Sequence, residues 1–193
     1  MKKSKHLLFQ EQQEQISRDT MNKKQISRIM IFGRPGSGKS SFAWELAKKT
    51  GLPLYHLDKY FFVNNWVERN YQEFLAIQHS IVEKDHWIID GNSRRSLEMR
   101  YSKVDIALYL NYNKWLCLYR LFKRLFYKNP KIDDRAENCL EVIRWKLIKY
   151  MWSYEKLIDK DLERLRHKYP NVELIEVNSN RQLDKIRERL YNI

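Results

Sequence analysis

A glycine-rich octapeptide, Gly33-Arg34-Pro35-Gly36-Ser37-Gly38-Lys39-Ser40, restricts the fold of this chain more than any other segment. It fits the spacing Gly-x-x-x-x-Gly-Lys-Ser/Thr at every fixed position. An apolar run, residues 28–32, precedes it, and a segment of helical composition, residues 39–50, follows it. Glycines let the backbone turn its N–H groups inward, where they and the N-terminus of the next helix can hold phosphate oxygens. This order of strand, loop and helix therefore predicts a phosphate-binding loop.

Two side chains at the end of the loop have separate predicted roles. The ammonium group of Lys39 can reach the terminal phosphates of a nucleotide, and the hydroxyl group of Ser40 can bind Mg²⁺. We therefore expect ATP and Mg²⁺ as the ligands of this loop. The residues expected to bind the nucleotide are Gly33, Arg34, Pro35, Gly36, Ser37, Gly38, Lys39, Ser40 and Ser41.

Apolar runs of strand length alternate with helix-like segments along the chain, which is the pattern of a parallel α/β sheet. The expected strands are residues 28–32, 54–57, 87–89, 106–110 and 172–177. The main expected helices are residues 39–50, 71–83, 114–127, 136–167 and 181–190. Residues 1–25 are polar and rich in glutamine, so we expect a flexible extension there, with Met21 as an alternative start. A single domain is expected over residues 26–193.

The net charge of +13 has three possible explanations. The basic residues could neutralise a polyphosphate substrate, form a patch for nucleic acid or anionic lipid, or lie scattered on a solvated surface. The sequence contains neither an apolar run long enough for a membrane helix nor the apolar stretch of a secretory signal. We therefore expect a cytoplasmic protein that is not membrane-bound and is either a monomer or a homodimer. The two cysteines lack metal-ligand spacing, so we expect reduced thiols.

Two aspartates follow expected strands: Asp58 comes after residues 54–57 and Asp90 after residues 87–89. Ligands of open α/β sheets bind beyond the carboxyl ends of the strands, so both side chains should lie near the phosphate-binding loop. An aspartate there can help to hold Mg²⁺ or accept a proton from an attacking hydroxyl group. The alternative for each is a helix-capping or turn aspartate.

Three arginines are candidates for contacts with phosphate groups. Arg94 lies four residues after Asp90, and Arg120 and Arg124 share one face of the expected helix 114–127. Arginines stabilise the negative charge that phosphoryl transfer moves onto oxygen atoms. The alternative is that the pair on the helix belongs to a solvated surface.

These residues resemble the nucleoside-monophosphate-kinase-like branch of P-loop proteins. Adenylate kinases carry Asp-Gly-aromatic-Pro-Arg after the third strand, where this chain reads Asp90-Gly91-Asn92-Ser93-Arg94. They also carry an Arg-x-x-x-Arg pair that matches Arg120 and Arg124. A closer resemblance, over residues 25–190, is to the small bacterial family of DNA topology modulation proteins, which are FlaR-related. The segments that resemble this family are residues 31–40, 50–58, 87–92, 120, 123–124 and 150–154.

The resemblance implies a three-layer α/β fold of the P-loop NTPase type. Its five parallel strands would take the order 2-3-1-4-5, residues 60–84 would form an acceptor-binding region, and residues 127–141 would form a mobile lid. It also implies a kinase that transfers the γ-phosphoryl group of Mg²⁺·ATP to a small-molecule or nucleotide acceptor. The implied catalytic residues are Lys39, Asp58, Asp90, Arg94, Arg120 and Arg124, with Ser40 and Asp90 at the metal.

The alternative function is that of an ATP-binding regulatory protein that acts on nucleic acid. Basic and aromatic residues alternate in Arg144-Trp145-Lys146 and Lys149-Tyr150, as they do on surfaces that stack nucleic-acid bases. The same aromatic residues would also suit the core side of a helix. Phosphate release with a panel of acceptors, beside DNA binding at two salt concentrations, distinguishes the two functions.

Overall fold

The structure is a computed structural model that describes residues 26–127, 131–139 and 145–193. The extension expected at residues 1–25 lies outside the described residues, as do residues 128–130 and 140–141 of the expected lid. Five parallel strands form one sheet in the order β2-β3-β1-β4-β5, which confirms the predicted fold and strand order. The strands are β1 (Arg28–Gly33), β2 (Leu54–His56), β3 (Trp87–Asp90), β4 (Ile106–Leu110) and β5 (Glu173–Val177).

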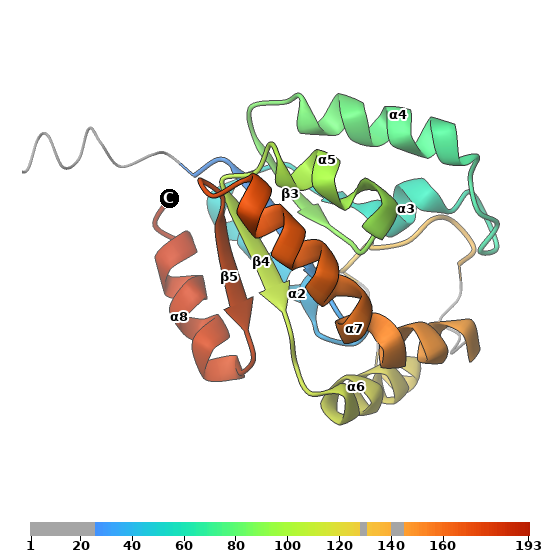
Figure 1. The fold of residues 1–193 in the computed structure, drawn as a ribbon. Helices are drawn as coiled ribbons and strands as arrows, with labels where there is room; N and C mark the ends of the chain where they lie inside the picture. Colours follow the sequence, from blue (N-terminus) through green and yellow to red (C-terminus); the bar gives the residue numbers. More distant parts are fainter. Residues whose placement is uncertain (1–25, 128–130, 140–144) are drawn as a thin grey trace, which may run out of the picture.

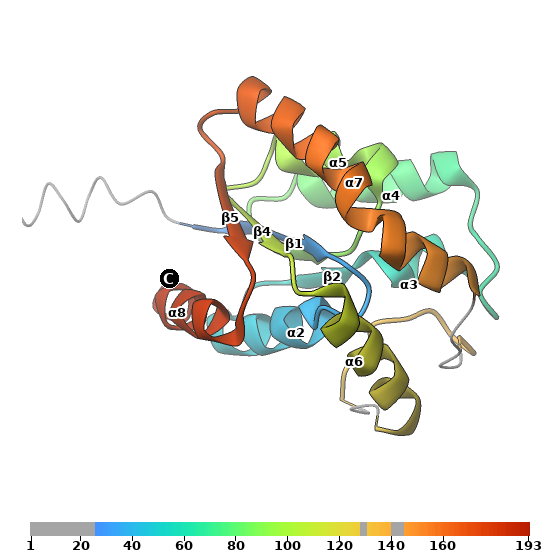
Figure 2. The same ribbon diagram turned by 60° about the horizontal axis from the view of Figure 1, so that its bottom comes forward.

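Helices cover both faces of the sheet, which gives three layers (Figures 1 and 2). The helices α2 (Lys39–Thr50) and α8 (Asn180–Leu190) pack on one face. The helices α4 (Tyr71–Val82), α5 (Leu97–Tyr101) and α7 (Trp145–Lys168) pack on the other. Because both faces are covered, β3 and β4 are buried along their whole length and read as continuous apolar runs in the sequence.

The carboxyl ends of the strands form the edge of the sheet at which the loop of residues 33–40 lies. Gly33, the last residue of β1, pairs with Leu110 of β4, and Ile31 pairs with Asp90 at the end of β3. Short helices follow at this edge: α3 (Leu57–Phe61) comes directly after β2, and the 3₁₀ helix η1 (Arg94–Ser96) comes soon after β3. The helix α6 (Lys114–Phe126) and the first turns of α7 extend beyond the same edge (Figures 1 and 2).

The expected helix 136–167 is wrong at its beginning, because residues 136–139 are not helical, and its described helical part is α7 (Trp145–Lys168). Residues 131–139 are not helical. Asn138 has a positive φ of 54°, and Glu137 forms a β-bridge with Asn64, so the backbone here pairs with a distant segment instead of with itself. Leu57, expected in the second strand, instead begins α3. Within the described ranges, the helices lack the combination of length and apolar character needed to cross a membrane.

Candidate active site

The loop of residues 33–40 requires glycine at two positions for steric reasons. A Cβ atom on Gly33 would lie 2.4 Å from the carbonyl oxygen of Leu110, and one on Gly36 would lie 2.3 Å from the carbonyl oxygen of Cys117. Gly36 also has a φ of 82°, a backbone conformation that other residues rarely adopt. The loop is therefore held against both β4 and α6, and α2 begins directly after it at Lys39.

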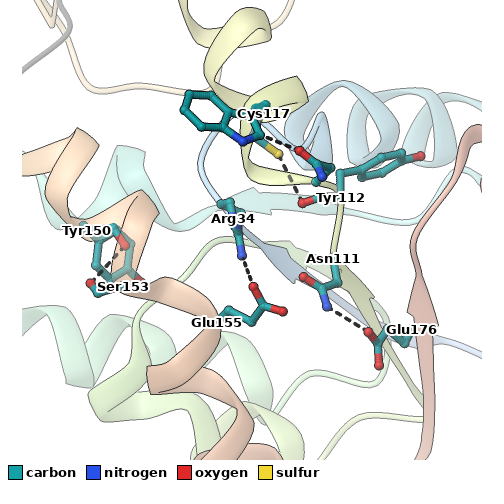
Figure 3. Close-up of polar contacts among 10 residues, drawn as sticks. Arg34, Asn111, Tyr112, Cys117, Tyr150, Ser153, Glu155 and Glu176 are labelled. Carbon is teal, nitrogen blue, oxygen red and sulfur yellow. Dashed lines mark hydrogen bonds and ion pairs between the residues drawn. The ribbon is translucent and has the colours of Figure 1, made fainter.

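The side chain of Arg34 anchors this loop to α7. It is only 2% exposed, and its Nη2 atom lies 2.7 Å from Oε2 of Glu155 (Figure 3). Arg34 was predicted among the nucleotide-binding residues. Its side chain does not line either cavity at the loop, so only its backbone is left to take part in binding a phosphate.

Asn92 fastens the end of β3 to the beginning of the loop. Its Oδ1 accepts a hydrogen bond of 3.0 Å from the N–H of Gly33, and its Nδ2 donates one of 2.6 Å to the carbonyl of Gly33. The hydroxyl group of Tyr154 on α7 donates a further hydrogen bond of 3.1 Å to Asn92 Oδ1. The side-chain amide of Asn92 thus bonds both backbone groups of Gly33, as a residue of a neighbouring strand would. Sequence reasoning did not assign this positioning role to Asn92.

Asp90 forms a buried pair with His56, which sequence reasoning also missed. The two residues are 3% and 6% exposed, and Nδ1 of His56 donates a hydrogen bond of 2.8 Å to Oδ2 of Asp90. Burial opposes ionisation of Asp90, but the hydrogen bond from His56 and the charge of Lys39 outweigh it and hold the pKa of Asp90 below its usual value. The sequence signal for this pair was the position of His56 at the end of an expected strand. The strand β2 pairs with β3 in a register that sets His56 beside Asp90.

The other oxygen of Asp90, Oδ1, is buried and forms no hydrogen bond of ordinary geometry within the described residues, although the hydroxyl group of Ser40 lies near enough to the carboxylate to help lower the pKa of Asp90. A buried carboxylate oxygen that lacks a partner is a suitable ligand for a hard cation such as Mg²⁺. The described residues contain no cluster of three or more His, Cys, Asp or Glu side chains that could hold a metal. Asp90 and Ser40 therefore fit a metal ion that takes its remaining ligands from phosphate groups and water.

The predicted arginines lie in two different places. Arg120 donates a hydrogen bond of 3.1 Å to the carbonyl of Ser37, and it lines a cavity of about 320 Å³ between the loop and α6 together with Arg124. Arg94 lines neither this cavity nor its neighbour. Its Nη2 atom instead lies 2.7 Å from Oδ2 of Asp161 on α7.

A second cavity of about 380 Å³ adjoins the first and contains Asp58. Both cavities are lined by Gly36, Lys39, Ser40, Arg124 and Asp134, so they meet at the loop. The carboxylate of Asp58 is exposed to the cavity, yet protein surrounds it on most sides. This desolvation raises the pKa of Asp58 above its usual value, against the opposing charge of Lys39.

Comparison with known proteins supports the fold. No protein-family model matches the chain, and no curated protein matches its sequence. Shikimate kinase from Acinetobacter baumannii, solved with shikimate, is similar in structure with a TM-score of 0.54 and 15% identity, over 86% of this chain and 92% of that chain. An uncharacterised protein from Eubacterium ventriosum gives a TM-score of 0.45 and 19% identity, over 86% of this chain and 98% of that chain. A sugar kinase from Janibacter gives a TM-score of 0.37 and 14% identity, over 68% of this chain and 95% of that chain.

Three observations define the class of fold: the strand order, the geometry of the loop and the similarity in structure to shikimate kinase. The chain has a P-loop NTPase fold.

Proposed function

We propose that this chain is a kinase that transfers the γ-phosphoryl group of Mg²⁺·ATP to a hydroxyl group of a small acceptor. The observation that carries the proposal is the pair of adjoining cavities. One is bounded by the phosphate-binding loop and two arginines, and the other contains a carboxylate, Asp58. Phosphoryl transfer needs this arrangement, because the donor phosphate and the acceptor hydroxyl group must meet in line.

The loop cavity would bind the nucleotide. Backbone N–H groups of residues 33–40 and the N-terminus of α2 would hold phosphate oxygens, and Lys39 would add a positive charge. Ser40 and Asp90 would hold Mg²⁺, which supplies neutralisation of the phosphate charge when it is bound. Arg120 and Arg124 would stabilise the charge that develops on the transferred group.

Asp58 would be the base for the acceptor. Its carboxylate would take the proton of the acceptor hydroxyl group as that oxygen bonds to the γ-phosphorus, while the bond from the γ-phosphorus to the bridging oxygen of ADP breaks. The raised pKa of Asp58 supports this role, because a base with a pKa nearer to neutrality accepts a proton more readily. Residues 60–84 would form the acceptor-binding region, and residues 131–139 would form the described part of the lid.

The test measures ATP binding and phosphoryl transfer to a panel of hydroxyl compounds with the full chain. Lys39→Ala should abolish ATP binding or turnover and leave the fold intact. The matched control is Lys48→Ala, because Lys48 is an exposed lysine on the same helix and lines neither cavity. Unchanged ATP affinity in folded Lys39→Ala would disprove the proposal.

A second candidate is an ATP-binding regulatory protein that acts on nucleic acid, as in the topology modulation family whose motifs this chain resembles. One observation favours it: α6 exposes four aromatic side chains and also carries basic residues. The exposed aromatic residues are Trp115, Tyr119, Phe122 and Phe126. Bases can stack on such side chains. If DNA does not bind at low salt, this candidate is rejected; binding that weakens steeply with added salt supports it.

A further inference from the structure

One wall of the cavity beside Asp58 is aromatic. Its rings come from α3, the loop after it and α4, which follow one another in the sequence, and from the distant helix α7. The aromatic residues of the wall are Phe61, Phe62, Trp66, Phe74 and Tyr150. Phe61 makes edge-to-face contacts with Phe62 and Phe74, with ring centroids 4.8 and 5.1 Å apart. These contacts fix the rings, so the wall is already built without a ligand.

Trp66 is held in this wall by an unusual backbone conformation. Its φ is 61° and that of the preceding Asn65 is 46°, in a region that bulky side chains rarely occupy. The N–H of Trp66 points to Sγ of Cys139 at 3.2 Å, and the Trp66 ring packs edge-to-face on Phe62 at 5.0 Å. Strain of this kind persists where the surroundings impose it, and it gathers at ligand sites.

The charged groups of this cavity do not suit a phosphorylated acceptor. Lys39 and Arg124 lie where it meets the loop cavity, in reach of the phosphates of ATP. Of the other cations that line it in the described part of the chain, Arg135 and Lys146 are each ion-paired with a carboxylate. These partners are Asp134, with Nε to Oδ1 at 3.6 Å, and Glu68, with Nζ to Oε1 at 3.3 Å.

Arg94, which the sequence suggested as a candidate for a contact with a phosphate group, lies outside the cavity in its ion pair with Asp161. The carboxylate of Asp58, which lies outside these two ion pairs, also lines the cavity and would repel a phosphate dianion. A molecule with many hydroxyl groups is disfavoured as well, because aromatic walls leave most of its hydrogen bonds unmade.

From this wall and these charges we infer that the acceptor is a neutral molecule with a planar aromatic ring and a hydroxyl group. The inference rests on the proposed kinase function. The ring lies among the aromatic side chains, and its hydroxyl group reaches Asp58, which removes the proton as the phosphoryl group arrives. Nucleosides and simple aromatic alcohols share this chemistry.

The test compares four sets of acceptors with the full chain and Mg²⁺·ATP: nucleosides, hydroxymethylpyridines, nucleoside 5′-monophosphates, and polyols that include shikimate and hexoses. Release of ADP gives kcat/KM for each. Thermal shifts with a non-hydrolysable ATP analogue give binding. We expect one of the first two sets to exceed both others in kcat/KM by at least about tenfold, consistent with ring stacking as the source of affinity.

Variants at Trp66 test the role of the wall. Trp66→Leu should raise KM for the aromatic acceptor on the order of tenfold, with KM for ATP unchanged, and Trp66→Phe should retain most of the affinity. Trp44→Leu is the matched control, because Trp44 lies on α2 and lines neither cavity.

The outcomes separate the inference from the function on which it rests. A preference for monophosphates or polyols, or an unchanged KM in Trp66→Leu, overturns the inference and leaves the kinase proposal standing. Binding of ATP without a thermal shift or turnover for either aromatic set also overturns the inference. Failure of the chain to bind ATP overturns both.

Discussion

Replacement of His56 by alanine would leave the carboxylate of Asp90 buried without its hydrogen-bond donor. The two residues are 6% and 3% exposed, so little water can take the place of the imidazole. Removal of one partner of a buried charged contact costs about 3 kcal/mol of unfolding free energy. For a domain of 150–250 residues, each kcal/mol lowers the melting temperature by about 2–4 °C, so we expect a fall of about 6–12 °C at pH 7.5.

The loss of melting temperature in His56→Ala should depend on pH and become smaller as the pH falls. In the wild type the pKa of Asp90 is held below its unfolded value, so the pair stabilises the protein above about pH 4, and this contribution is lost as the pH falls through the folded pKa. In His56→Ala the desolvation of Asp90 remains but the hydrogen bond is gone, so its pKa rises. Protonation then relieves the unpaired charge, and the difference in melting temperature from the wild type should narrow as the pH falls towards 4.

The assay is thermal unfolding followed by circular dichroism between pH 4 and 8. His79→Ala is the matched control, because His79 is exposed on α4, and it should melt within about 2 °C of the wild type. The double variant His56→Ala/Asp90→Asn should lose less stability than the sum of its single changes, because both remove the same contact. A melting temperature of His56→Ala within 2 °C of the wild type at pH 7.5, or a gap that does not narrow, would refute the reasoning.

Three further predictions concern the proposed reaction. Asp58→Asn should lower turnover on the order of 10²–10⁴-fold with ATP affinity retained. Because desolvation in the cavity raises the pKa of Asp58, kcat/KM of the wild type should fall as the pH is lowered, at a higher pH than an ordinary aspartate would give; a flat pH profile contradicts this. Arg120→Ala and Arg124→Ala should each reduce kcat by about 10²-fold or more and weaken ATP binding by less, as measured in single-turnover and binding assays. Equal losses of kcat and of ATP affinity would mean that these arginines act in ground-state binding. Gly36→Ala should weaken ATP binding in titration calorimetry because its Cβ meets a backbone carbonyl at 2.3 Å, whereas Gly51→Ala, with a similar φ and open space, should not.

The parts of the site that local sequence encodes were predictable. The loop of residues 33–40 has fixed spacing, and Asp90 follows a buried strand, so both could be placed at the carboxyl edge of the sheet before the structure was considered. The strand order came from resemblance, since periodicity alone does not state which strands are neighbours.

The contacts between distant segments were not predictable. Arg34 and Arg94 pair with Glu155 and Asp161, partners 121 and 67 residues away, and no pattern in the sequence links a lone arginine to a carboxylate at such a distance. The aromatic cavity is hidden for the same reason, because its wall is assembled from separate segments. Asn138 shows the complementary limit: its left-handed backbone interrupts the beginning of a helical pattern that composition alone would predict.

The contacts of α7 fix the number of residues between two parts of this helix. Leu147 and Tyr150 line the cavity beside Asp58, and one turn later Tyr154 and Glu155 hold Asn92 and Arg34. An α-helix turns by about 100° per residue, so one residue inserted between Tyr150 and Tyr154 would keep the first pair in place and rotate the second pair away from the loop. Lineages that descend from this chain can therefore exchange side chains along α7 more easily than they can gain or lose a residue within it.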